Sequence, residues 1–125
     1  MIDRLFDIHE VQWENYGEGI RACVFKASPN GIIQYWEIQP GIGAASHSHP
    51  AEQITYVQSG VMRLWIDGRA YDMTAGCFAH IPSGAVHQTE NIGSGILVNV
   101  DFFLPDRADR TESPKIKDLG HHWDD

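Results

Sequence analysis

Cysteine is scarce in this sequence, and its start lacks the pattern of a secretion signal. Only two cysteines, Cys23 and Cys77, occur in 125 residues, which is too few for a disulfide framework. The opening stretch MIDRLFDIHEV carries acidic residues where a signal peptide has a cationic start and an apolar run. These features predict a cytoplasmic protein whose reduced thiols serve as small buried hydrophobic groups.

Positive charge and long apolar runs are scarce as well. Nine Lys and Arg residues stand against 17 Asp and Glu residues, so the net charge is −8. Such a chain repels phosphate backbones and anionic bilayers, and we expect neither nucleic acid nor a membrane surface as a partner. No stretch approaches the roughly 20 apolar residues that span a bilayer. A small acidic metabolite is compatible with this charge, because one arginine or one bound metal can reverse the local field.

Helical periodicity is missing, while short strand-like segments recur along the chain. No apolar helical period extends beyond a few residues. The segments are rich in β-branched and aromatic residues, or end at turns that contain glycine or proline, such as SPNG at residues 28–31. This punctuation predicts an all-β sandwich or barrel. The expected strands cover residues 20–27, 32–40, 53–60, 61–68, 69–76, 77–84 and 96–105.

Length and apolar content predict a single domain. A chain of 125 residues with 42% hydrophobic residues is large enough for a real core, burying roughly two-thirds of its unfolded surface. We expect residues 1–108 to form the barrel together with an N-terminal lead-in, in which residues 6–13 are a short helix or irregular. Residues 109–125 are polar and are expected to form a C-terminal arm or tail.

Two short segments carry the histidines of interest. In the first, HSHPAEQ, one residue separates His47 from His49, so on a strand their side chains would share one face. Imidazole nitrogens on one face can hold one metal ion, although a pair of this kind also occurs as plain surface histidine. In the second segment, His87 follows a PSG turn at residues 82–84, and such a turn can return a strand to the interior of a barrel.

The spacing of these segments resembles the two sequence motifs of the cupin superfamily. The resemblance implies a double-stranded β-helix, or jelly-roll barrel, with a metal inside its mouth and His47, His49 and His87 as ligands. One position departs from the family, which usually has glutamate where this chain has Gln53. The first motif contains Gly41, His47, His49, Gln53 and Gly60, and the second contains Gly76, Pro82, Gly84, His87 and Asn91.

The fourth ligand is the open question in the first motif. The family's spacing from His49 points to Gln53, whereas Glu52 is one residue away and would face the opposite side of a strand. With Gln53 as ligand, a divalent ion keeps its formal charge of two, so it is a stronger Lewis acid and is held less tightly. Nitrogen-rich ligation disfavours Mg and Ca, and we expect Zn, Ni, Fe, Mn or Cu.

A strand near residue 100 contains a candidate catalytic group. Alternation puts Asn99, Asp101 and Phe103 on one face, and if that face looks into the cavity, Asp101 could move protons near the metal. The alternative is an edge carboxylate in solvent. Beyond the strand, Arg107 could clamp a carboxylate or lie on the surface, and Arg63 is a weaker candidate for the same task.

The stretches HSHPAEQITYVQSG and NVDFFLPDR look like those of the small KdgF-type cupins of pectin and alginate breakdown. Those proteins open 4,5-unsaturated uronate monosaccharides to linear keto acids. The resemblance implies an isomerase- or lyase-like enzyme with a metal on His47, His49, Gln53 and His87, and with Asp101 and Arg107 acting on the substrate. Ala51 departs from it, because many relatives have another histidine there.

Two other functions fit the same motifs. One is a different metal-dependent cupin enzyme, such as a dioxygenase or another isomerase, and the other is a metabolite-binding cupin without turnover. We also expect a homodimer, because small cupins resemble half of a two-barrel architecture. The apolar stretch GIIQYW would otherwise leave an exposed sheet edge or face.

Overall fold

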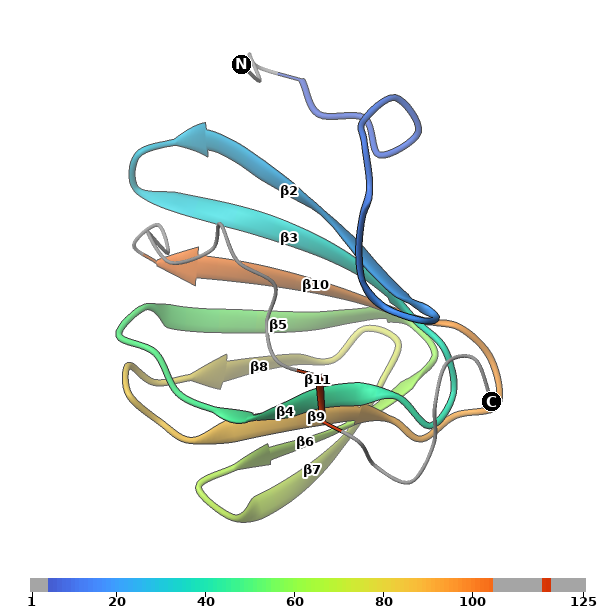
Figure 1. Ribbon diagram of the computed structural model, residues 1–125. Coiled ribbons are helices and arrows are strands. Elements are labelled where there is room, and N and C mark those ends of the chain that lie inside the picture. Colours follow the sequence, from blue (N-terminus) through green and yellow to red (C-terminus); the bar gives the residue numbers. More distant parts are fainter. Residues whose placement is uncertain (1–4, 105–115, 118–125) are drawn as a thin grey trace.

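The computed structural model describes residues 5–104 and 116–117, which form two antiparallel sheets that face each other (Figure 1). The described residues contain no helix, and the all-β prediction is confirmed. The six-stranded sheet has the order β1 (Glu14–Gly17), β2 (Ile20–Ser28), β3 (Gly31–Ile38), β10 (Leu97–Leu104), β5 (Glu52–Ser59) and β8 (Phe78–Ile81). The five-stranded sheet has the order β11 (Ile116–Lys117), β4 (Gly43–His47), β9 (His87–Asn91), β6 (Val61–Ile66) and β7 (Arg69–Thr74).

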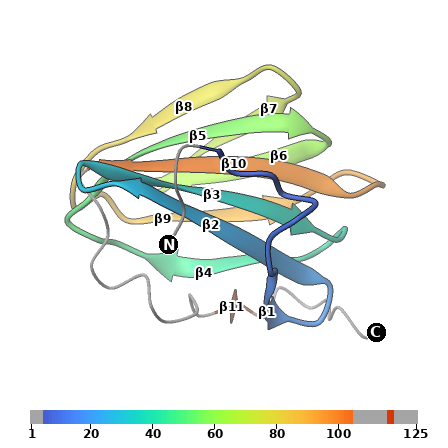
Figure 2. The ribbon, with the colours of Figure 1, turned by 90° about the horizontal axis from the view of Figure 1, so that it is seen from above.

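The chain crosses between the sheets repeatedly, which gives a jelly-roll barrel. From β3 the chain passes to β4 in the other sheet, returns to β5, and crosses again to β6. Later, β8, β9 and β10 also alternate between the sheets. Seen from above, the six-stranded sheet lies over the five-stranded one, with β10 between β3 and β5 (Figure 2). The strands that carry the two histidine motifs therefore come together, although they are distant in sequence.

Strict alternation of side chains builds the core between the sheets. In β3 every second residue is buried, from Ile32 through Gln34 and Trp36 to Ile38. Such a period of two is what a strand with one inward face requires. The main core cluster comes from both sheets and contains Tyr16, Ile20, Ala22, Trp36, Ile38, Ile42, Val57, Met62, Leu64, Met73, Ile81, Ala85 and Leu97.

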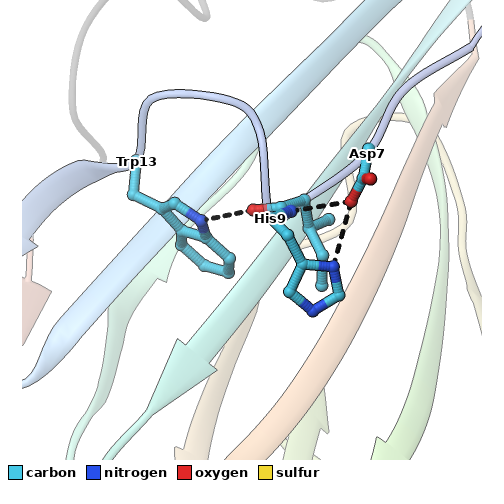
Figure 3. A network of polar contacts seen from close by, with 4 residues as sticks. Asp7, His9 and Trp13 are labelled. Carbon is cyan, nitrogen blue, oxygen red and sulfur yellow. Dashed lines mark hydrogen bonds and ion pairs between the residues drawn. The ribbon is translucent and has the colours of Figure 1, made fainter.

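The lead-in at residues 6–13 contains a turn and is not helical. The Asp7 carboxylate accepts hydrogen bonds from the backbone and ring nitrogens of His9, and the Trp13 indole donates to the carbonyl of Ile8 at 2.9 Å (Figure 3). The segment packs on the six-stranded sheet, where the Trp13 ring meets Tyr35 edge-on with 5.8 Å between centroids. It leads into β1, a polar strand that the sequence patterns did not indicate.

The expected boundary between barrel and tail, at residues 108 and 109, lies outside the described residues. Within the expected tail, Ile116 and Lys117 form β11, which pairs with Ala44 and Gly43 of β4. This short strand extends the edge of the five-stranded sheet next to the first histidine motif. Among the residues that the structure describes, no helix is long and apolar enough to cross a membrane.

Both cysteines are free, as the sequence predicted. Cys23 is buried on β2, while Cys77 is partly buried and packs against the core. Burial raises the pKa of the Cys23 thiol to about 11, and the nearby Glu37 carboxylate acts in the same direction. Cys23 is therefore a protonated, unreactive hydrophobic group at neutral pH.

Candidate metal centre

Three imidazoles meet in the mouth of the barrel. His47 ends β4, His87 begins β9, and these two residues are paired in the ladder between the strands. His49 comes from the connection that follows β4. One nitrogen of each ring lies within 4.8 Å of the others, which groups the three imidazoles as candidate ligands of one ion. His49 and His87 are buried, and His47 is partly exposed.

The reason for this convergence differs from the one expected from sequence. His47 and His49 were expected to share one face of a strand, but β4 ends at His47 and His49 lies in a loop. The loop is instead held by the turn that precedes His87. The backbone nitrogen of Gly84 donates to the His49 carbonyl at 2.9 Å, and the Ser83 hydroxyl donates to the Pro50 carbonyl at 2.6 Å. The second motif therefore positions a histidine of the first.

Backbone carbonyls fix the tautomer of all three histidines. Each ring has its Nδ1 atom within hydrogen-bond distance of a carbonyl oxygen two residues away in its own segment. A carbonyl can only accept, so Nδ1 carries the hydrogen, and in the neutral ring that binds metal Nε2 keeps its lone pair. A fixed Nδ1–H is the usual arrangement of a histidine that ligates metal through Nε2. The acceptors are Ala45 for His47, Ala51 for His49 and Ala85 for His87, at 2.7, 2.7 and 2.9 Å.

Gln53 faces the histidines, and Glu52 faces away. The Gln53 side chain is buried on β5, and its Oε1 atom lies 3.1 Å from Nε2 of His49. In the tautomer described above both atoms are acceptors, so their approach is favourable when they share one cation. Glu52 points to the outer surface and forms an ion pair with His80 of β8. The side-chain direction inferred from the cupin spacing agrees with this geometry.

The donor set fits a transition metal. Three Nε2 lone pairs and one amide oxygen converge, and this nitrogen-rich set suits Zn, Ni, Fe or Cu better than Mg or Ca. All four groups are neutral, so the full positive charge of a bound ion would be available to attract anionic oxygen. His47, His49, Gln53 and His87 would be the residues that hold it.

A pocket of about 450 Å³, which includes the space at its open mouth, extends from these groups into the barrel. Asp101 of β10 lines it and is only 7% exposed, so the alternative of an edge carboxylate in solvent is wrong. Both apolar and polar side chains line the cavity, as expected for a small-molecule site. The lining residues are Ile20, Trp36, Ile38, Ala44, His47, Gln53, His87, Thr89, Asn99, Asp101 and Phe103.

The Asp101 carboxylate is held by two donors that sequence reasoning did not identify. The indole nitrogen of Trp36 donates to Oδ2 at 3.1 Å, and the amide nitrogen of Asn99 lies 3.4 Å from Oδ1. Alternation alone places Trp36 and Asn99 on inward faces. The Trp36 contact depends on the register between β3 and β10, which joins residues 65 positions apart and has no local sequence signal. Asn99 reaches Asp101 from two residues earlier on the same strand.

The two arginine candidates have different outcomes. Arg107 lies outside the described residues, so its role as a clamp stays a prediction. Arg63 is exposed on β6 and forms an ion pair with Asp72 of β7, with 2.7 Å between Nε and Oδ1. The adjacent carboxylate raises the pKa of Arg63 further, so the guanidinium is charged but is paired with Asp72 on the surface.

Comparison with known proteins agrees with this architecture. Residues 34–103 match the family model described as a cupin domain. The pectin degradation protein KdgF of Dickeya dadantii (strain 3937) is 26% identical over 107 residues, which cover 85% of this chain and 96% of that protein.

Two solved structures show the same fold. KdgF from Halomonas sp. superposes with a TM-score of 0.76 at 22% identity, covering 87% of this chain and 98% of that one. An RmlC-like cupin from Shewanella frigidimarina NCIMB 400 gives a TM-score of 0.76 at 24% identity, covering 84% and 93%.

Proposed function

Since the chain belongs to the cupin family, whose model spans residues 34–103, we propose that its histidine centre serves a metal-dependent enzyme. The proposed reaction opens the ring of a 4,5-unsaturated uronate monosaccharide and tautomerises the product. The observation that carries the proposal is one pocket that joins a neutral, nitrogen-rich donor set to a buried carboxylate, Asp101. The likeness to a relative named for pectin degradation supports the choice of substrate class.

The chemistry of the substrate matches what this pocket offers. An unsaturated uronate has a carboxylate, several hydroxyl oxygens and an enol ether in its ring. A metal bound by His47, His49, Gln53 and His87 would supply a Lewis acid for substrate oxygen. Because the protein groups in that set are neutral, an anionic sugar is not repelled there despite the net charge of −8.

The proton transfers can be assigned to Asp101. In the proposed reaction its carboxylate accepts the proton of the anomeric hydroxyl while the bond between C1 and the ring oxygen breaks, giving an aldehyde and an enolate. Asp101 then returns this proton to C4, and the enolate becomes a ketone. The product is an isomer of the substrate, so the reaction consumes neither oxygen nor another co-reactant. A general acid–base group of this kind accounts for roughly 100-fold or more of the rate.

The test follows the ultraviolet absorbance of the conjugated C4=C5 bond, which ring opening removes. We expect the metal-loaded protein to abolish this absorbance in the absence of oxygen, and Asp101→Asn to slow it roughly 100-fold with metal content unchanged. Oxygen uptake with a redox metal would instead indicate a dioxygenase. Binding of the sugar without turnover, unaffected by Asp101→Asn, would indicate a metabolite-binding cupin.

A further inference from the structure

A buried tryptophan donates a hydrogen bond to the proposed catalytic carboxylate. Trp36 lies on β3 and is 5% exposed, and its Nε1 atom is 3.1 Å from Oδ2 of Asp101. An indole nitrogen only donates and does not ionise near neutral pH, so it cannot replace Asp101 as an acid or base. What it can do is fix one oxygen of the carboxylate in space.

Packing in turn fixes the indole. The Trp36 ring lies against Tyr16, with 4.8 Å between ring centroids, and both residues belong to the main core cluster. An indole that is packed in this way loses little entropy on forming its hydrogen bond. The donor therefore has a set direction before any substrate arrives, which is the condition for preorganisation.

A second donor supports the same carboxylate from the other oxygen. Asn99 is 3% exposed, and its amide nitrogen lies 3.4 Å from Oδ1 of Asp101. That amide is anchored more strongly to the buried Thr55, whose hydroxyl oxygen is 2.6 Å away. The contact to Asp101 is the longer one, so Asn99 restrains the carboxylate less than Trp36 does.

We propose that Trp36 is a positioning residue for Asp101, holding its carboxylate in the orientation from which the proton transfers occur. The inference rests on the proposed function, because those transfers belong to the uronate reaction. Loss of the indole N–H lets the carboxylate rotate about its last bond. Loss of the N–H is therefore expected to slow the chemical step and to leave substrate binding unchanged, because the N–H contacts Asp101 and not the metal ligands.

Trp36→Phe removes the N–H and keeps most of the ring. We expect kcat to fall about tenfold, with KM within about twofold of the wild-type value and metal content unchanged. The matched control is Trp13→Phe, which also removes one indole hydrogen bond but lies on the lead-in (Figure 3). That control should keep the wild-type kcat.

A double-mutant cycle separates positioning from a structural effect. If Trp36 acts through Asp101, adding Trp36→Phe to Asp101→Asn should cause no further loss of kcat. The inference is overturned if the two losses multiply, if Trp36→Phe leaves kcat at the wild-type value, or if its metal content falls.

The hydrogen bond itself can be followed without turnover. In a nitrogen–proton correlation spectrum, the Trp36 indole signal should shift in Asp101→Asn, whereas the Trp13 indole signal should not. If the wild-type protein does not turn over unsaturated uronates, the proposed function fails, while this measurement still decides whether the Trp36 indole holds the Asp101 carboxylate. A Trp36 signal that is unchanged in Asp101→Asn would overturn the inference.

Discussion

At the candidate metal centre, three alanine carbonyls determine which nitrogen of each histidine is available to ligate a metal. By accepting from Nδ1, the carbonyls of Ala45, Ala51 and Ala85 leave Nε2 as the ligating nitrogen of each ring. The identity of those residues hardly matters, because any backbone carbonyl can accept. This explains why the histidine spacing could be read from sequence, whereas the groups that orient the rings could not.

The choice between Gln53 and Glu52 as the fourth ligand can be tested by single substitutions. Gln53→Glu adds a negative charge next to the histidine nitrogens, so we expect slower loss of metal to a chelator. Turnover of an anionic substrate should fall, because the net charge of the centre decreases from two to one.

The control for this change is Glu52→Gln, which alters only an ion pair with His80 on the surface. We expect the control to leave metal retention and turnover near wild type, since exposed ion pairs contribute little. Metal retention that responds to Glu52→Gln and not to Gln53→Glu would mean that the opposite face of β5 meets the metal.

Among the elements, the close approach of β4 and β9 brings the two motifs together. A Cβ atom on Gly43 would lie 1.8 Å from the carbonyl oxygen of Thr89, so only glycine allows these strands their present spacing. Farther along the same ladder, His47 pairs with His87. The distance between two of the proposed ligands thus depends on a residue without a side chain.

We expect Gly43→Ala to lower the free energy of unfolding by about 2 kcal/mol, because the strands must move apart. Metal affinity should fall in the same variant, since His47 moves away from His87. Denaturant titration of the apo-protein and chelator competition measure the two effects. Gly95→Ala is the matched control, because a Cβ there meets nothing within 4 Å. Equal stability and affinity in the two variants would contradict this account.

The strands differ in how far they could be predicted. Strands with buried alternation and a turn at the end, such as β3 and β5, were expected almost at their observed limits. The two-residue β11 and the polar β1 were not, because they exist through pairing with distant partners and not through a pattern of their own. The loop position of His49 was missed for a related reason, since tertiary hydrogen bonds from residues 83 and 84 place it.

For the whole molecule, the outer face of the six-stranded sheet is the surface that suggests self-association. The lead-in covers part of this face at β2, where Phe6 stacks on Phe25 with 4.9 Å between centroids. Farther across the sheet, Tyr56 stacks on Phe78 of β8, which is 67% exposed. We propose that a second copy of the chain covers this part of the sheet in a homodimer.

Phe78→Glu tests the homodimer, because a charge in an apolar interface opposes association. Light scattering at micromolar concentration should give a dimer for the wild-type chain and a larger monomer fraction for the variant. Tyr71→Glu is the control, since Tyr71 is also an exposed aromatic residue, at 41%, but lies on β7 of the other sheet. A wild-type chain that is strictly monomeric would contradict the proposal.

The central claim is that His47, His49, Gln53 and His87 hold one transition metal, and elemental analysis tests it most directly. The wild-type protein and His49→Ala should be purified in parallel, with His80→Ala as a control for loss of a surface histidine. The account predicts one divalent transition metal per chain in the wild type and the control, and loss of most of it in His49→Ala. Full metal occupancy in His49→Ala would contradict it.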